Sequence, residues 1–187
     1  MTESEYLSGQ FLIAMPALDD PNFFHGVAFI CEHNEDGAMG LIINRPTAIS
    51  IGEILTQLGL EWPRQDVADQ MVLQGGPVET ERGFVIHTPV GDWNATIDAG
   101  DNIGISSSKD IMQAISEGKE PEKMLITLGY AGWGPGQLEE EMAANTWLSV
   151  AADPDIIFNT PFENRWEAAA QSVGIDLNLL SNDIGHA

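Results

Sequence analysis

The residues best suited to metal chemistry in this sequence are Cys31, His33 and Glu35. They alternate along a segment typical of a strand, so their side chains would share one face, and all three side-chain types bind zinc. The same alternation also fits a strand face that passes from the core to solvent. This second interpretation is favoured, because structural zinc sites usually show paired ligand spacings on both sides. We predict no metal or other cofactor, and these three residues are the candidates if a metal is bound.

Two other groups have the residue types of a catalytic site. Asp19 and Asp20 are paired carboxylates suited to proton transfer, but an Asp-Pro sequence is also a common turn. Ser106 and Lys109 have the S-x-x-K spacing of a serine nucleophile, although the companion motifs of that enzyme class are absent. A serine run before a helix is ordinary capping chemistry, so structural roles are favoured for both groups. The enzymatic alternative is a metal-assisted hydrolase that uses the thiol and imidazole above or the two aspartates.

Three segments place turn residues directly after predicted strands, where proteins often hold ligands. Arg45 puts a cation after a buried strand, and a Gly-Gly-Pro turn puts bare backbone after another. In the third segment, Trp133 stands between glycines, and its ring either fills the core or forms a pocket wall with hydrogen bonds from Gln137. The predicted ligand-binding residues are Asn44, Arg45, Gly75, Gly76, Pro77, Gly132, Trp133, Gly134 and Gln137.

The glycine-rich stretch LGYAGWGPGQLEEE, residues 128–141, does not match a phosphate-binding loop. The dinucleotide pattern G-x-G-x-x-G fails at its third glycine, and no Lys-Ser or Lys-Thr follows as in a P-loop. The three glutamates at the start of the next helix would oppose a phosphate there. They also fan about 100° apart around the helix, so they cannot converge on a metal ion. A sharp turn from a strand into a helix is the favoured interpretation.

A hairpin is the clearest strand prediction. Residues 27–44 hold two apolar runs around Asp36-Gly37, which has the side-chain chemistry of a type I′ turn. Both runs are almost continuously apolar, which predicts that each strand is covered on both faces. The other predicted strands span residues 71–74, 83–88, 102–105, 124–128 and 156–159.

Helix limits are predicted from capping signals. Ser50 and Glu53 have capping-box spacing, and Thr160 followed by proline has the pattern of another N-cap. The predicted helices span residues 50–59, 108–118 and 160–174. Strands and helices are interspersed without strict alternation, and the length of 187 residues suits one core. We therefore predict an α+β fold in one compact domain, residues 1–187, with a mixed or largely antiparallel sheet.

The charge balance disfavours polyanionic partners. Seven Lys and Arg against 29 Asp and Glu give a net charge of −22. A protein that holds duplex DNA neutralises about 6 to 10 phosphates, which would require nearly every cation here. Direct nucleic-acid binding is therefore disfavoured. The acidic start, MTESEYLSGQ, does not have the pattern of a signal peptide, and the apolar runs are too short to span a membrane. The single cysteine suits a reducing compartment. We expect a cytoplasmic protein that contacts no membrane.

Taken together and in order, several of these stretches resemble the AlgH/YqgE family of bacterial proteins. The resemblance runs from GQFLIAMPALDDPNFFHGVAFICEHNEDGAMGLIINRP through LQGGPVETERGFVIH and LGYAGWGPGQLEEE to NRWEAAAQSVGID and the closing GHA. It implies a compact α+β domain with a barrel-like sheet flanked by helices, and a biochemical role that is not established. One branch of the family is known as a regulator of alginate production, which is the origin of its transcriptional-regulator label. The family brings no catalytic residues.

The sequence as a whole favours a binding or regulatory protein that acts through a protein or small-molecule partner. An enzyme of the metal-assisted hydrolase type is one alternative. A direct DNA-binding transcriptional regulator is the other, and the net charge argues against it.

Overall fold

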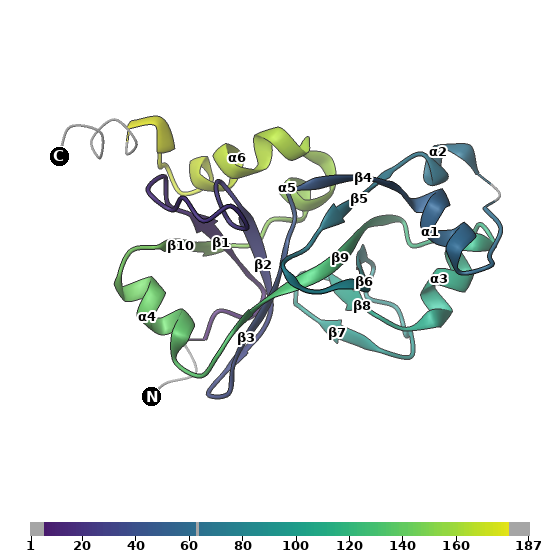
Figure 1. Ribbon diagram of the computed structural model, residues 1–187, viewed down its shortest axis with the longest axis horizontal. Helices are drawn as coiled ribbons and strands as arrows, with labels where there is room; N and C mark the ends of the chain where they lie inside the picture. Colours follow the sequence, from purple (N-terminus) through teal and green to yellow (C-terminus); the bar gives the residue numbers. More distant parts are fainter. Residues whose placement is uncertain (1–5, 63, 180–187) are drawn as a thin grey trace.

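The strands join into one continuous, curled sheet (Figure 1). The computed structural model describes residues 6–62 and 64–179, so the closing GHA motif lies outside the described residues. The described strands are β1 (Gln10–Ala14), β2 (Val27–Asn34), β3 (Gly37–Ile42), β4 (Pro46–Ser50), β5 (Met71–Gln74), β6 (Val78–Thr88), β7 (Thr96–Asp98), β8 (Gly104–Ser106), β9 (Lys123–Trp133) and β10 (Trp147–Ala151). Their order is β10-β1-β2-β3-β9-β6-β8-β7, and β4 joins through β5 to β9. Only the β5–β9 pairing is parallel among the described strands, which confirms a mixed, largely antiparallel sheet.

Helices cover the sheet in two groups. The described helices are α1 (Ile51–Gln57), α2 (Gln65–Ala68), α3 (Lys109–Ser116), α4 (Gln137–Ala143), α5 (Pro154–Asn159), the 3-10 turn η2 (Phe162–Asn164) and α6 (Arg165–Gln171). In Figure 1, α1, α2 and α3 lie at one end of the molecule, α4 lies at the other end, and α6 and α5 lie between that end and the middle. None of the helices in the described ranges is long and apolar enough to cross a membrane. The α+β class is therefore confirmed.

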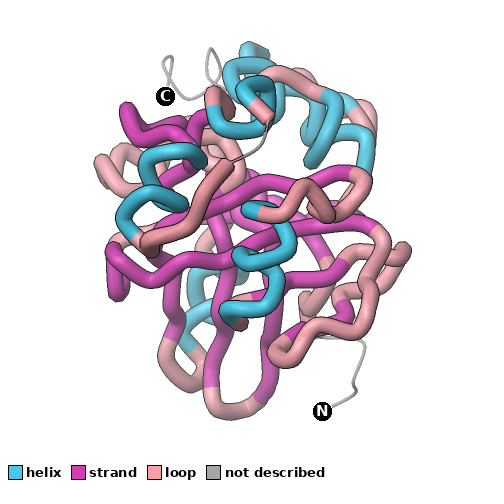
Figure 2. The backbone as a smooth tube through the Cα atoms, turned by 90° about the vertical axis from the view of Figure 1, so that its right-hand side faces the viewer, coloured by secondary structure: helices cyan, strands magenta, loops and turns pink. Residues whose placement is uncertain are grey.

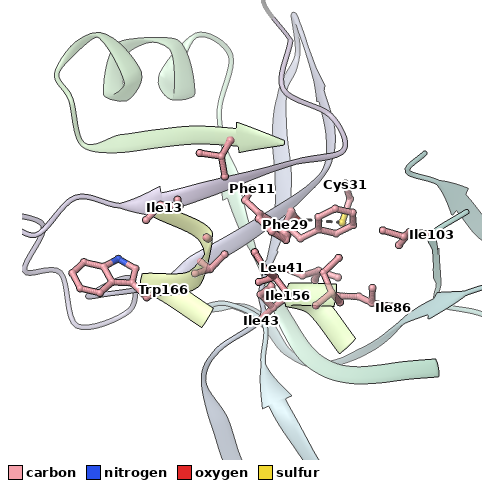
Figure 3. Packing of buried hydrophobic residues seen from close by; sticks show 14 of the residues in the cluster. Phe11, Ile13, Phe29, Cys31, Leu41, Ile43, Ile86, Ile103, Ile156 and Trp166 are labelled. Carbon is pink, nitrogen blue, oxygen red and sulfur yellow. Dashed lines mark hydrogen bonds between the residues drawn. The ribbon is translucent and has the colours of Figure 1, made fainter. Parts of the chain in front are cut away.

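The half of the β2–β3 hairpin that lies away from its turn is buried on both faces, as its apolar arms predict, and the residues next to the turn are partly exposed. Phe11 and Phe29 pack on one face with Trp166 of α6 (Figure 3). Leu12 and Ile30 pack on the other face, in the cluster that Leu138 of α4 joins. A third cluster fills the space between the sheet and the helices α1 and α3. Helices on both sides of the same strands explain why these arms show no polar alternation.

Strand β9 links the two ends of the molecule. It pairs with β3 at one end and with β5 and β6 at the other, and it runs across the molecule between them (Figure 1). Figure 2 shows from the side how helices pack on the outside of the strands. The strand predicted at residues 124–128 is therefore correct but too short. Its glycines, at positions 129 and 132, lie within the strand, so the turn into α4 occupies only residues 134–136.

The capping signals predict two helices well and one poorly. The capping box of Ser50 and Glu53 is present at α1, and Ser108 is the N-cap of α3. The strand predicted at residues 156–159 is wrong, because that segment is α5. Asp153 accepts a hydrogen bond from the backbone N–H of Asp155, and a proline stands at the first helical position, so these residues start a helix earlier.

One predicted helix start and one predicted turn type also need correction. Thr160 is the C-cap of α5 and not the N-cap of a longer helix, and α6 begins at Arg165 after η2. In the hairpin, Asn34 pairs with Gly37, so the turn residues are Glu35 and Asp36. Neither has a positive φ, which a type I′ turn requires at both positions. The hairpin is confirmed and its turn type is wrong.

Candidate ligand-binding site

Asn44 and Arg45 hold the loop of residues 21–26 against the end of β3. Asn44 Oδ1 accepts a hydrogen bond from the Val27 N–H at 2.9 Å, and its Nδ2 donates to the His25 carbonyl at 2.8 Å. Arg45 Nη1 and Nη2 donate at 2.7 Å to the carbonyls of Pro21 and Phe24. A single amide and a single guanidinium thus fix the loop at both its ends. The pair Asn44-Arg45 therefore sets the position of the residues that the loop presents.

The loop presents His25 in a conformation that is uncommon for a residue with a side chain. Its φ is 53°, in the left-handed region. The imidazole is stacked between the rings of Phe24 and Trp166, with centroid separations of 3.9 and 3.7 Å. Burial lowers the pKa of His25, the charge on Arg45 lowers it further, and Glu167 opposes both effects. Strained residues of this kind persist where the surroundings hold them, and they concentrate at functional sites.

These residues surround an open hollow of about 360 Å³, which we call the His25 hollow. Its aromatic walls come from Phe24, His25 and Trp166, and its polar lining includes Glu163 and Glu167. The Phe24 side chain is 48% exposed, although Arg45 donates a hydrogen bond to the Phe24 carbonyl and holds the residue in place. An exposed phenylalanine at a fixed position is unusual. With His25 neutral, the two glutamates outnumber the single cation, Arg45. The hollow combines aromatic faces with a local negative charge.

The predicted turn residues Gly75, Gly76 and Pro77 lie against β9. Gly75 and Gly76 are buried, whereas Pro77 is exposed. A Cβ atom on Gly76 would come within 2.1 Å of the Tyr130 carbonyl carbon, and one on Gly75 within 2.4 Å of the Gly129 carbonyl oxygen. The glycines are therefore required by the close approach of two backbones. Their role as ligand contacts stays a prediction.

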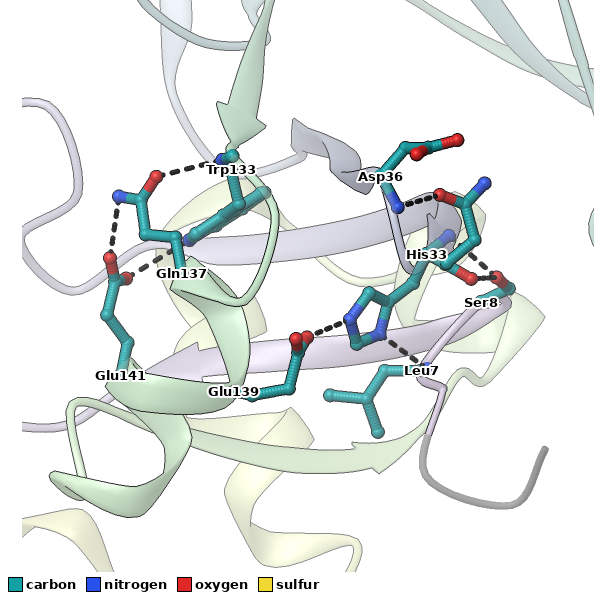
Figure 4. A network of polar contacts seen from close by, with 10 residues as sticks. Leu7, Ser8, His33, Asp36, Trp133, Gln137, Glu139 and Glu141 are labelled. Carbon is teal, nitrogen blue, oxygen red and sulfur yellow. Dashed lines mark hydrogen bonds and ion pairs between the residues drawn. The ribbon is translucent and has the colours of Figure 1, made fainter. Parts of the chain in front are cut away.

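Trp133 and Gln137 belong to a closed network of hydrogen bonds (Figure 4). Glu141 Oε1 accepts from the Trp133 indole at 3.1 Å and from the Trp147 indole at 2.8 Å, while its Oε2 accepts from Gln137 Nε2 at 2.8 Å. Gln137 Oε1 accepts from the Gly134 N–H at 2.9 Å. Trp133 is 6% exposed and packs in the core. The ring fills the core, and its role as a pocket wall with Gln137 stays a prediction.

The predicted site residues therefore fall into three places. Asn44 and Arg45 line the His25 hollow, and the Gly75-Gly76 turn packs on β9. Trp133 lines a different hollow, of about 230 Å³, together with Asp36 and other residues of the hairpin. Gly132 and Gly134 are exposed beside it.

The candidate metal ligands are separated. The register of β2 shifts between Ile30 and Glu32, which marks a β-bulge and ends the simple alternation of faces. Cys31 still packs in the core cluster with Phe29, where burial raises the pKa of its thiol. His33 Nδ1 accepts from the Leu7 N–H at 3.0 Å on the other face, and Nε2 pairs with Glu139 of α4 (Figure 4).

The expectation that these three candidates share a face is therefore wrong. Glu35 is exposed in the hairpin turn, away from the buried thiol. Within residues 6–62 and 64–179, no group of three or more His, Cys, Asp or Glu residues is placed to hold a metal ion.

The other groups with catalytic residue types have structural surroundings. Asp20 Oδ1 accepts from the Asn22 N–H at 2.8 Å, in the turn that the Asp-Pro sequence predicts. The Ser106 hydroxyl contacts Nε2 of His87 at 2.7 Å, and His87 Nδ1 donates to the Pro89 carbonyl at 2.9 Å. Ser106 and His87 are both fully buried, and burial lowers the pKa of the imidazole. This serine and histidine form an internal polar contact beneath the surface.

The scarce basic residues do not form an electropositive groove. Three of the seven Lys and Arg residues line one hollow, but three carboxylates line it as well. The cations are Arg64, Lys123 and Arg165, and the carboxylates are Asp66, Glu120 and Glu122. Their formal charges cancel.

Comparison with known proteins identifies the family of this chain. The family model described as AlgH-like matches residues 11–178. The chain belongs to the AlgH-like family. A UPF0301 protein of Nitrosococcus oceani is 54% identical over 182 residues, which are 97% of each chain. A UPF0301 protein of Thioalkalivibrio sulfidiphilus is 49% identical over 187 residues and is covered completely.

The fold of this AlgH-like chain is also found in solved structures. The solution structure of the AlgH protein from Pseudomonas aeruginosa has a TM-score of 0.80 at 46% identity, with 97% of this chain and 96% of that chain covered. A crystal structure from Corynebacterium diphtheriae has a TM-score of 0.75 at 19% identity, with 97% and 94% covered. The resemblance predicted from the sequence motifs is confirmed.

Sequence reasoning about this AlgH-like chain missed His25, Phe24 and Trp166. The signal that could have pointed to them is the segment PNFFHG, which places two aromatic rings and an imidazole in a loop bounded by proline and glycine. Trp166 lies 141 positions away from His25 in the sequence, and only the packing of α6 on β1 and β2 brings it to the loop.

Proposed function

We propose that this AlgH-like protein is a binding protein with a regulatory role, and that its partner presents a cationic group to the His25 hollow. The observation that supports the proposal is the strained His25 ring, stacked between Phe24 and Trp166 beside Glu163 and Glu167. Aromatic faces and carboxylates together recognise cations, through cation–π contacts and charge pairing. A basic segment of a protein and a small amine-bearing molecule offer the same chemistry.

Two further features support a binding role. Asn44 and Arg45 fix the loop through its carbonyls and N–H groups, so the aromatic rings are held in place before a partner arrives, which reduces the ordering cost of binding. The net charge of −22 also attracts cationic partners over a distance and speeds their association. Both features favour recognition without requiring a chemical step.

A cationic probe and its neutral analogue test this proposal. N-acetyl-arginine amide should shift the NMR signals of the Phe24 and His25 amides and of the Trp166 indole N–H, whereas N-acetyl-citrulline amide should not. Glu167→Gln should weaken binding by about fivefold, the size expected for one partly exposed charge pair. Glu61→Gln, an equal charge change at an exposed position outside the hollow, is the matched control. Equal shifts with both probes, or no shifts at all, would rule the proposal out.

A peptide and a single amino acid separate the two kinds of partner. A short arginine-containing peptide that binds much more tightly than N-acetyl-arginine amide indicates a protein partner. Equal affinity of the two probes indicates a small-molecule partner, because the flanking peptide then adds no contacts.

We also propose that the protein does not hold nucleic acid directly, because three of the seven Lys and Arg residues are paired with carboxylates. Fluorescence anisotropy of a labelled DNA duplex should show no binding even at low salt. Binding that is strong at low salt and disappears as salt rises would contradict this expectation.

A further inference from the structure

Four of the seven basic side chains have no carboxylate partner within 4 Å among the described residues, although carboxylates outnumber them fourfold. These four are Arg45, Lys109, Lys123 and Arg165. Two of the four, Lys123 and Arg165, line the same hollow.

This second hollow, which we call the Arg165 hollow, has a volume of about 610 Å³. It lies between the start of β9, the α2 segment and the turn from α5 into α6. Phe158 and Phe162 provide apolar wall, and Phe162 also lines the His25 hollow, so this ring separates the two hollows. The space is large enough for a small organic molecule.

Arg165 is the residue that gives the hollow its chemistry. It is only 3% exposed, yet its partners are neutral: Nε donates to the Thr160 carbonyl at 2.9 Å, and Nη1 donates to the Ile43 carbonyl. Its guanidinium carbon lies 5.0 Å from the centre of the Phe162 ring. Nη2 has no hydrogen-bond partner within the described part of the chain and is not sealed from solvent.

A buried charge without a carboxylate in direct contact is costly in free energy; Glu163 offsets only part of that cost from a distance, and an anion bound beside Arg165 would offset more of it. Burial lowers the pKa of Arg165 to about 10, so the side chain is still protonated at neutral pH. Two of its nitrogens are fixed by carbonyls, which leaves the third without a partner among the described residues. The position of the charge is therefore set before any ligand binds.

Lys123 supplies a second cation on the wall of the same hollow. Its Nζ donates to Asn159 Oδ1 at 3.0 Å, a neutral acceptor that places the ammonium group without cancelling its charge. Of the three carboxylates that line the hollow, Asp66 and Glu120 accept hydrogen bonds from Arg64, and Glu122 lies at an exposed position. Lys123 and Arg165 are thus the two cations of the hollow that have no carboxylate within 4 Å among the described residues.

We propose that the Arg165 hollow binds an organic anion, whose carboxylate or phosphate group contacts Arg165 and Lys123 and whose apolar part lies against Phe158 and Phe162. Carboxylate and phosphate oxygens share the acceptor geometry that a guanidinium recognises. The acidic residues on the rim, and the negative charge of the whole chain, select for a compact ligand with one anionic group and against polyanions. This site is separate from the cationic site proposed above and does not depend on it.

Calorimetric titration of the full chain with four probes tests the proposal. The probes are benzoate, phenyl phosphate, inorganic phosphate and the neutral benzyl alcohol, each to millimolar concentration. We expect benzoate or phenyl phosphate to bind and benzyl alcohol not to bind. Tighter binding of benzoate indicates a carboxylate ligand, and tighter binding of phenyl phosphate indicates a phosphate ester. Binding of inorganic phosphate as tight as that of phenyl phosphate would overturn the apolar part of the proposal.

Charge-matched variants locate the site. Lys123→Gln should weaken binding by about fivefold, as for a partly exposed pair, and Arg165→Lys by about tenfold, because an ammonium group cannot reproduce the guanidinium fork. Lys119→Gln removes the same charge at a position that is 77% exposed and outside the hollow, and it should leave binding unchanged. Lys123 is exposed, so its variant reports on binding even if the Arg165 variant folds poorly.

The proposal is wrong if neither benzoate nor phenyl phosphate binds to the unmodified chain. It is equally wrong if Lys119→Gln and Lys123→Gln weaken binding to the same extent, because the anion would then respond only to net charge.

Discussion

The two segments that the sequence marks as binding sites, residues 44–45 and residues 133–137, use their hydrogen bonds in different ways. Asn44 and Arg45 spend their hydrogen bonds on the backbone of a neighbouring loop and thereby hold aromatic side chains at an open hollow. The Trp133 indole and the Gln137 amide both donate to one glutamate, Glu141, and Gln137 Oε1 accepts from the Gly134 N–H. The first arrangement leaves the Phe24 ring, which is 48% exposed, available for a partner. The second consumes its own polar groups and completes a core.

A polar residue after a strand is not itself the informative feature. What matters is whether its hydrogen bonds end within a closed set or position something else. The largest free-energy effect on folding is expected for the buried ring of the closed network, Trp133, whereas a residue that positions a loop should affect both folding and binding.

The largest effect is expected from Trp133→Ala. The substitution removes a ring that is 6% exposed and leaves a cavity, which should cost about 3–5 kcal/mol in the free energy of unfolding. Urea denaturation followed by circular dichroism measures it. Trp62→Ala makes the same chemical change at a side chain that is 40% exposed, and it should cost much less. Equal costs for the two variants would show that Trp133 does not fill the core.

The next largest effect is expected from Gly76→Ala. The new Cβ would collide with the Tyr130 carbonyl group, and the φ of 157° lies at the edge of the region that favours glycine, so a loss of about 3 kcal/mol is expected. In Gly134→Ala, the nearest atom to the new Cβ is 3.9 Å away, in ordinary contact, and the change should be within about 0.5 kcal/mol. The two melting temperatures measure the difference. Similar losses would contradict the backbone contact between the Gly75-Gly76 turn and β9.

A smaller effect is expected from Asn44→Ala. It leaves the Val27 N–H without its acceptor and releases the His25 carbonyl, which should cost about 2 kcal/mol in unfolding free energy. Binding of the arginine probe should weaken as well, because the loop loses its anchor. Gln137→Ala, at an exposed position, should cost less than about 1 kcal/mol and leave the probe affinity unchanged. An Asn44 variant with unchanged probe affinity would separate the loop from the hollow.

The smallest effect is expected from the pH dependence of His25. Its folded pKa lies below the ordinary value of 6.5, so the unfolded chain binds more protons there. Stability is therefore fully present above pH 6.5 and is lost as the pH falls through the folded pKa. His25→Asn keeps a residue that tolerates the left-handed region and should reduce this slope.

Part of the slope will remain in His25→Asn, because burial also lowers the pKa of His87, with the same sign. Urea denaturation at a series of pH values measures both slopes. A slope that is identical in the variant would show that His25 titrates equally in the folded and unfolded chain.

Local chemistry made much of the fold predictable. The capping box at Ser50 and Glu53, the apolar arms of the β2–β3 hairpin and the motif order all led to correct elements. The errors arose where two local signals competed. The apolar run of residues 156–159 resembles a strand, but Asp153 and Pro154 start a helix just before it.

The candidate site was less predictable, because its contacts are long-range. The position of Asn44 and Arg45 after a strand predicts them as site residues. Their hydrogen-bond acceptors are carbonyls in residues 21–25, which the sequence does not indicate. The separation of Cys31 from His33 depends on a β-bulge, for which the sequence carries no signal. Whether residues 1–187 unfold as one unit remains a prediction.

The path of β9 has a consequence for any attempt to divide this chain. Because β3 pairs with one portion of that strand and β5 and β6 with another, a truncation before residue 123 would leave unprotected edges on both remaining pieces. The two fragments made by such a cut should aggregate when they are expressed separately. They should fold only when they are produced together.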